Sequence, residues 1–192
     1  STRTYYQRLR DYDYRVGCSG KLDLAKPDNW NSDGARPCTF TFGFTHPIEI
    51  EGKMHSGNNP QPRGPYGFWL QERGLYERYH ADYRRRAANG WIKDASHDSV
   101  LPADAFQDTY IGQRAVEWLR RIPEDYPWHL FVSFAGPHDP FDPPTVYAER
   151  FRHAPMPAPI QDDLADKPVW QRTRDLRLSP EEVAITRRQY CA

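Results

Sequence analysis

The segment 128–144 constrains the fold more than any other part of the chain. Residues 128–134 (WHLFVSF) form a nearly continuous apolar and aromatic run. Such a run is typical of a strand that is buried on both faces of a parallel sheet. Residues 135–144 (AGPHDPFDPP) then contain four prolines, which exclude a helix interior and a central strand and predict a rigid, extended loop.

Three further segments predict the elements around this strand. Residues 14–18 (YRVGC) are rich in β-formers and predict a second buried strand. Residues 104–121 carry apolar side chains at helical spacing, namely Phe106, Tyr110, Ile111, Val116, Leu119 and, just beyond, Ile122. Residues 67–88 predict one or two short surface helices, in which Arg84-Arg85-Arg86 is interpreted as a solvated face. Strand, helix and strand together predict an α/β fold.

Both ends of the chain predict helices. Residues 4–10 have the spacing of an amphipathic helix, and we expect the chain to open inside it. Ser179-Pro180-Glu181-Glu182 forms a capping box that opens a helix running to Ala192. A chain that starts in one helix and stops in another is expected to be an internal segment of a larger protein. Between the two strands we expect a loop-rich insertion over about residues 26–100, with a short strand at 47–50.

Composition excludes several classes of protein. Lys plus Arg and Asp plus Glu number 26 each, so the basic surplus of a nucleic-acid binder is missing. Apolar runs are only a few residues long, whereas a membrane-spanning helix needs about 20. The 27 aromatic residues (6 Trp, 12 Tyr and 9 Phe) are incompatible with a disordered chain. A folded domain without a membrane segment is expected.

Candidate site residues follow the two predicted strands. Lys21 and Asp23 come after the first strand, and His138 comes after the second. Ligands of open α/β sheets bind at the carboxyl ends of the strands. A cation, a carboxylate and an imidazole at one edge would suit an anionic substrate and proton transfer to a leaving group.

The same residues carry a resemblance to a known family. Residues 14–24 (YRVGCSGKLDL) resemble the second signature of the sulfatases, a helix and a short strand that end in Gly-Lys-x-His. Residues 132–140 (VSFAGPHDP) are similar to the later strand and loop that carry the catalytic histidine of the family. Gly43-Phe44 lies between these segments, and Arg187-Arg188-Gln189-Tyr190 extends the similarity, so it spans nearly the whole chain.

The resemblance implies an alkaline-phosphatase-like α/β fold with a mostly parallel central sheet, and hydrolysis of sulfate esters, either small molecules or saccharides. Residues 1–192 would be the central part of one sulfatase catalytic domain. The family uses a formylglycine nucleophile and a Ca²⁺ or Mg²⁺ ion. Carried over by position, Lys21 would contact the sulfate and His138 would lie near the bridging ester oxygen.

Two departures from the family pattern matter. None of the three cysteines begins a Cys-x-Pro-x-Arg run, and no residue matches the family's metal ligands, so nucleophile and metal are expected outside this segment. The usual histidine two residues after the lysine is Asp23, and a carboxylate donates a hydrogen bond only when it is protonated. Asp23 is kept as a substrate-binding candidate, and His55 is a second candidate that could replace the missing imidazole.

Alternatives remain open at this point. Gly52-Lys53-Met54-His55 also matches Gly-Lys-x-His, but it lacks the preceding helix and buried strand, so Lys21 is preferred. Sulfate and phosphate are similar tetrahedral anions, so a phosphoester or phosphonate ester hydrolase of the same superfamily is an alternative function. A binding module that keeps the fold without catalysis is another.

Overall fold

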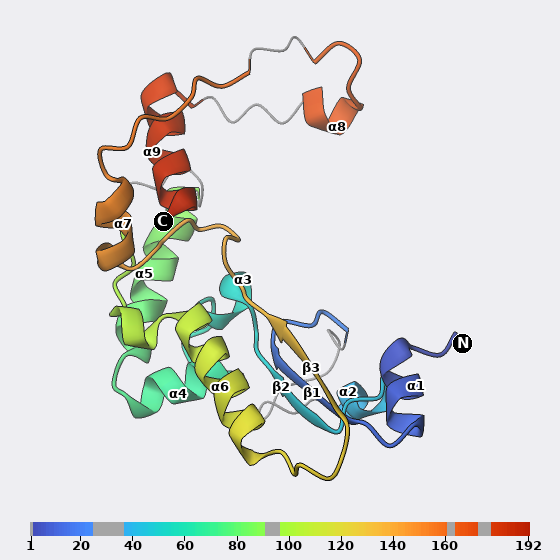
Figure 1. The fold of residues 1–192 in the computed structure, drawn as a ribbon. Helices are drawn as coiled ribbons and strands as arrows, with labels where there is room; N and C mark the ends of the chain where they lie inside the picture. Colours follow the sequence, from blue (N-terminus) through green and yellow to red (C-terminus); the bar gives the residue numbers. More distant parts are fainter. Residues whose placement is uncertain (1, 25–36, 91–96, 161–163, 173–177) are drawn as a thin grey trace.

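A computed structural model describes residues 2–24, 37–90, 97–160, 164–172 and 178–192. Its centre is a three-stranded sheet with the order β2-β1-β3, built from β1 (Arg15–Gly20), β2 (His46–Glu49) and β3 (Trp128–Ser133). Both neighbours of β1 run parallel to it. The structure therefore confirms the predicted α/β class with a parallel sheet flanked by helices (Figure 1).

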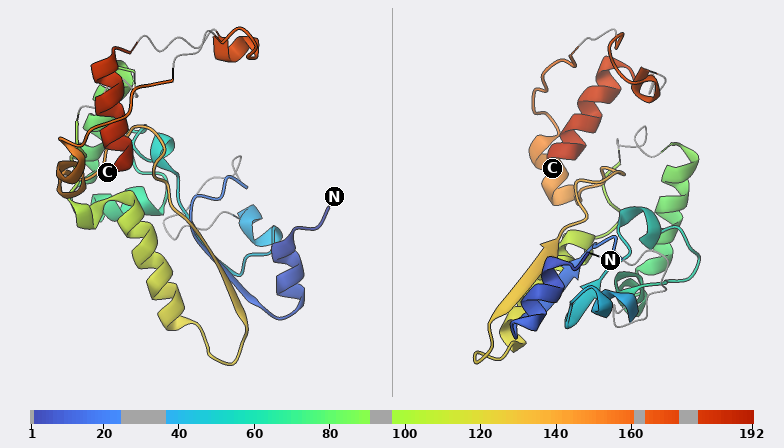
Figure 2. Two further views of the ribbon diagram at one scale, coloured as in Figure 1. Left: turned by 45° about the horizontal axis from the view of Figure 1, so that its top comes forward. Right: turned by 90° about the vertical axis from the view of Figure 1, so that its right-hand side faces the viewer.

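Alternation along β1 explains how both faces of the sheet are covered. Val16 and Cys18 pack with Tyr6 of α1 (Tyr5–Asp11) on one face. On the other face the Ser19 hydroxyl donates to Ile111 O of α6 (Gln107–Arg121) at 2.8 Å. Gly17 has no room for a side chain, because a Cβ there would lie 2.5 Å from the Trp118 ring. The sheet is thus sandwiched between α1 and α6 (Figures 1 and 2).

Helix α6 is present where the sequence predicts it, but its buried face coincides only in part with the predicted apolar stripe. Tyr110, Ile111, Ala115 and Trp118 are buried, at the spacing of one helix face. Val116 and Leu119, which the sequence analysis placed on the apolar stripe, are more than two-fifths exposed. A short 3-10 helix, Ala103–Ala105, precedes α6.

A second core lies beside the sheet, in the helices α4 (Pro65–Glu72) and α5 (Tyr76–Ala88). It contains Tyr66, Leu70, Tyr76, Tyr79 and Tyr83, packed with residues of α6. The two short helices predicted here are present, but they do not lie on the surface alone, because their aromatic side chains form a core. Arg86 is also not solvated: it is fully buried, and its Nε donates to Asp82 Oδ2 at 2.7 Å.

Two expectations about the strands and the first helix need correction. Strand β3 is only half-buried, with Trp128 and Val132 exposed, because it is an edge strand among the residues that the structure describes. The chain does not open inside α1. Thr4 is its N-cap, and a capping box with Gln7 starts the helix at Tyr5.

The range 26–100 holds more regular structure than the sequence suggests. Besides β2, α4 and α5 it contains α2 (Pro37–Thr41) and α3 (Lys53–Ser56). The remaining helices are α7 (Thr145–Phe151), α8 (Val169–Arg172) and α9 (Pro180–Cys191), and α9 begins at the predicted Ser179 capping box. Helices α7 and α9 lie beyond the carboxyl ends of the strands (Figure 1). Over the described ranges, no helix is long and apolar enough to cross a membrane.

Candidate active site at the carboxyl edge of the sheet

The three strands end at the same level. Gly20, the last residue of β1, pairs with Ser133 of β3 and with Glu49 of β2, which are the last residues of their strands. Backbone hydrogen bonds continue this alignment, since Lys21 N donates to Ser133 O at 3.2 Å and Ile50 N to Gly20 O at 3.0 Å. The segments that begin at Lys21, Ile50 and Phe134 therefore leave one edge of the sheet together.

Lys21 stands directly after β1. Its aliphatic stem lies against Gly52, where a Cβ would come within 2.8 Å of Lys21 Cδ. Gly52 has a φ of 74°, a region that side chains disfavour, so this position suits glycine on two grounds. The Lys21 ammonium lies 3.4 Å from Asp23 Oδ2, with 28% of the lysine side chain exposed. The cation is thus partly open to solvent and balanced by a half-exposed carboxylate.

His138 stands in the loop after β3, and its hydrogen bonds define the state of its ring. Nδ1 lies 2.7 Å from the backbone oxygen of Asp139. A carbonyl oxygen only accepts, so Nδ1 carries the hydrogen. The Asp139 carboxylate, 3.1 Å from the same nitrogen, pairs with the ring when it is protonated. Nε2 is therefore the nitrogen that can exchange a proton with a ligand.

The start of the loop after β3 is held by Asp108, in the first turn of α6. Its carboxylate accepts from Ala135 N at 2.7 Å and from Gly136 N at 3.0 Å. Gly136 fits so closely that a Cβ there would lie 2.4 Å from Asp108 Oδ2. The sequence analysis did not single out Asp108. Its position in the first turn of α6 gives no signal for this contact, because the amides belong to a loop 27 residues further along the chain.

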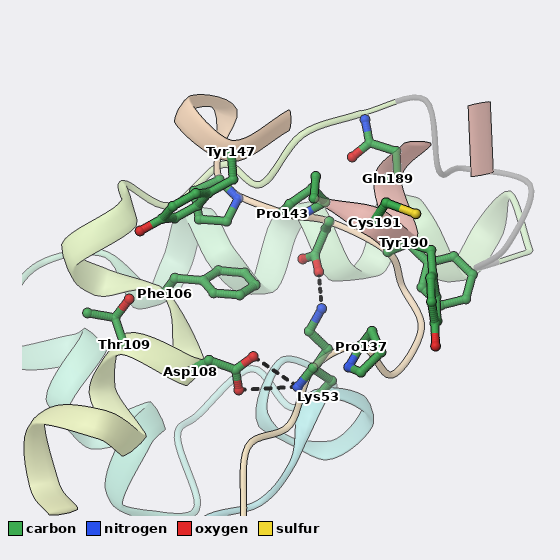
Figure 3. A pocket seen from close by; sticks show the side chains of 15 residues that line it. Lys53, Phe106, Asp108, Thr109, Pro137, Pro143, Tyr147, Gln189, Tyr190 and Cys191 are labelled. Atoms are coloured by element: carbon green, nitrogen blue, oxygen red, sulfur yellow. Dashed lines mark hydrogen bonds and ion pairs between the residues drawn. The ribbon is translucent and has the colours of Figure 1, made fainter. Parts of the chain in front are cut away.

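The end of the same loop is held by Lys53 of α3. Its ammonium donates to Asp142 Oδ1 at 2.5 Å, the bond drawn from Lys53 in Figure 3, and to Pro140 O at 2.9 Å. Both side chains are buried, with 5% and 3% exposed. Burial raises the pKa of the Asp142 carboxyl above its ordinary value, and the Lys53 ammonium opposes that shift.

The second Gly-Lys-x-His match therefore differs from the first in its surroundings. Lys53 is committed to a buried ion pair, whereas Lys21 is partly open to solvent. His55, the other candidate of this match, is exposed on α3. Asp142 was passed over in the sequence because it lies within a run of prolines that indicated only a rigid loop.

A pocket of about 490 Å³ borders the loop after β3. Its lining includes the aromatic residues Phe106, Phe141, Tyr147 and Tyr190, the charged residues Lys53, Asp108 and Asp142, and Pro137, which is next to His138 in the chain (Figure 3). Lys21 and His138 are not among the described residues that line it. The pocket is thus a different surface from the one that Lys21 occupies at the carboxyl end of β1.

The described residues do not fit a metal ion. Within the described ranges, no group of three or more His, Cys, Asp or Glu side chains is placed to hold one. The described residues therefore do not form a site for the metal that the sulfatase resemblance implies.

Fold and site together define an α/β protein with candidate anion-contacting and proton-transferring side chains at the carboxyl edge of a parallel sheet. No family model matches the chain. An arylsulfatase of Clostridium perfringens is 33% identical over 162 residues, which are 80% of this chain and 31% of the relative. The phosphonate monoester hydrolase of Agrobacterium radiobacter has a similar fold, with a TM-score of 0.61 at 19% identity. That match covers 96% of this chain and 39% of the hydrolase.

The chain belongs to the sulfatase and alkaline-phosphatase-like superfamily, and it spans about a third of the length of the relatives reported above. Its homologues are hydrolases of this superfamily.

Proposed function

We propose that this chain is part of a sulfuric ester hydrolase and supplies the side chains that bind the sulfate and release the alcohol. The observation that carries the proposal is the alignment of the strand ends. Because β1 and β3 are adjacent and parallel and end in register, Lys21 and the His138 loop start from neighbouring positions. The similarity to an arylsulfatase over 80% of the chain supports the sulfate ester as the substrate class.

Lys21 is the proposed sulfate ligand. Its ammonium is partly exposed and has Asp23 as a partner at 3.4 Å, a distance at which the ion pair is loose enough to admit an anion. On substrate binding, the ammonium contacts a sulfate oxygen and stabilises the charge that develops on the sulfuryl group. Asp23 keeps the ammonium oriented toward the edge of the sheet.

His138 is the proposed proton donor to the leaving group. As the bond between sulfur and the bridging oxygen breaks, the electron pair moves to that oxygen, and Nε2–H of the imidazolium delivers a proton to it. The Asp139 backbone oxygen and carboxylate on the Nδ1 side stabilise the charged ring before transfer. The alcohol then leaves in its neutral form. Nucleophile and metal ligands belong, in this proposal, to parts of the protein outside the chain.

The decisive experiment replaces the histidine in the complete protein. His138→Ala is expected to lower kcat on an aryl sulfate by about 10²–10⁴-fold, the usual contribution of a positioned general acid. His153→Ala is the matched control and is expected to keep kcat within about twofold, because His153 is an exposed histidine just after α7. Unchanged hydrolysis by His138→Ala would refute the role of His138.

Paired substrates test the ester class separately. Wild-type protein is assayed on an aryl sulfate, the matching aryl phosphate and a phosphonate monoester. We expect the highest kcat/KM on the sulfate. A clear preference for either phosphorus ester would replace sulfuryl transfer by phosphoryl or phosphonyl chemistry at the same edge, and inactivity on all three would favour a binding module.

A further inference from the structure

The loop that carries His138 is held by a buried cation, the ammonium group of Lys53. Lys53 reaches two groups of this loop, the Pro140 carbonyl oxygen at 2.9 Å and the Asp142 carboxylate at 2.5 Å. These groups lie two and four residues after His138. With Asp108 holding Ala135 and Gly136, hydrogen bonds to other elements fix the loop on both sides of the histidine.

The Lys53 ammonium is occupied by its bonds to this loop, and its side chain also borders the pocket of about 490 Å³. Only 5% of its side chain is exposed, and its ammonium faces the loop from within. Removing the ammonium would leave the Asp142 carboxylate buried without its cation, an arrangement that proteins avoid by moving or protonating the group. Either response displaces residues 140–142. It also displaces His138, which is joined to Pro140 by only two peptide bonds.

We infer that Lys53 is a positioning residue for His138, acting through Pro140 and Asp142 to hold the imidazole in line with the leaving oxygen. This inference rests on the proposed role of His138 as proton donor. Its physical basis is that misplacement of a catalytic group by about 1 Å can lower a rate by about 100-fold. Lys53, two residues before His55 in the second Gly-Lys-x-His match, thus positions His138 rather than binding sulfate.

The test is a double-substitution cycle in the complete protein, with an aryl sulfate whose phenol is a poor leaving group and one whose phenol is a good leaving group. Lys53→Met keeps the length of the stem and removes the charge. We expect it to lower kcat on the poor leaving group by about 10- to 100-fold, with KM within about threefold. The loss is expected to be much smaller on the good leaving group, which needs little proton donation.

In the His138→Ala background, Lys53→Met is expected to lower kcat by less than about twofold, because the group it positions is gone. An equal loss in both backgrounds would overturn the inference and leave the proposed function standing. If His138→Ala alone has no effect on kcat, the proposed function fails instead, which is a different result.

A matched control separates positioning from loss of stability. Leu70 is fully buried in α4, and its apolar side chain makes no hydrogen bond. Leu70→Ala is expected to lower the melting temperature without changing the ratio of kcat values on the two substrates. The same leaving-group-dependent loss in Leu70→Ala would contradict a specific role of Lys53.

A second variant covers the case in which Lys53→Met does not fold. Asp142→Asn retains an oxygen that can accept from Lys53 and removes the carboxylate charge. It is carried through the same cycle with the same two substrates. A kcat loss that depends on the leaving group and disappears in the His138→Ala background supports the inference, and a loss independent of His138 overturns it.

Discussion

The loops after β1 and β3 start from neighbouring strands but are built in different ways. The loop after β1 presents Lys21 and Asp23, an ion pair at 3.4 Å with both side chains partly exposed. The loop after β3 is tied down by Asp108 at its start and by the buried Lys53–Asp142 pair at its end. The charge of Lys21, after β1, is thus open to an additional anion. The charges around the loop after β3 instead fix the backbone of that loop.

The difference suits the two proposed tasks. A lysine that binds an anion by charge alone needs only to reach it, because an ammonium is a point charge without a preferred direction. A proton donor must lie on the line to the leaving oxygen, so its loop requires a fixed backbone. We therefore expect substitutions in the two loops to differ most in their effect on stability.

The largest difference is expected between Lys53→Met and Lys21→Met. Lys53→Met leaves a buried carboxylate without its cation and is expected to lower the free energy of unfolding by about 3–5 kcal/mol. Lys21→Met breaks a partly exposed pair and is expected to change it by less than about 1 kcal/mol. Urea denaturation of the complete protein at neutral pH measures both. Equal losses would show that the two pairs are energetically alike.

The pH dependence of this loss gives a second measure. Burial raises the pKa of Asp142, and Lys53 opposes that rise, so in Lys53→Met the folded-state pKa lies further above the unfolded one. The charged carboxylate is then penalised in the fold, and the stability deficit relative to the wild type grows as pH rises from the folded-state pKa of Asp142 in the wild type to its higher folded-state pKa in the variant. At low pH, where Asp142 is protonated in both states, the deficit shrinks. Lys21→Met is expected to show no such growth.

The contrast between the loops also shows how far the sequence alone could lead. The runs at 14–18 and 128–134 predicted both strands, and the resulting positions of Lys21 and His138 followed from the rule for parallel sheets. Partners such as Asp108 and Lys53 could not be predicted, because their contacts join residues that are 27 and 89 positions apart. Burial of Arg86 was missed for a different reason: its partner Asp82 is only four residues away, but a basic run does not reveal which of its members lies on the buried face of the helix.

A smaller effect on stability is expected at Gly20, the last residue of β1, where the strands that carry the two loops lie closest. This residue has a φ of 116°, and a Cβ there would lie 1.9 Å from Ser133 O. Gly20→Ala must therefore separate β1 from β3 and adopt a strained backbone, with an expected loss of about 3 kcal/mol. Gly74→Ala is the matched control, since Gly74 also has a positive φ of 68° but open space around it.

The loss in Gly74→Ala is expected to be about 1 kcal/mol, the cost of the backbone conformation alone. Thermal melts of the two variants of the complete protein separate strain from collision. If both variants lose the same stability, the close approach of Gly20 to Ser133 contributes nothing to the alignment of the strand ends.

The smallest of these effects is expected at Asp108. Asp108→Ala leaves the amides of Ala135 and Gly136 without their acceptor and is expected to lower the free energy of unfolding by about 2 kcal/mol. Asp104→Ala, which removes an exposed carboxylate paired with Arg73, controls for a lost surface ion pair and is expected to cost at most about 1 kcal/mol.

Hydrogen exchange at the Ala135 and Gly136 amides decides whether the loss lies in the loop. Faster exchange there with Asp108→Ala, but not with Asp104→Ala, is expected if Asp108 fixes the start of the His138 loop. Unchanged exchange would mean that Asp108 does not fix the start of this loop. Lys53 would then hold the loop from its end alone.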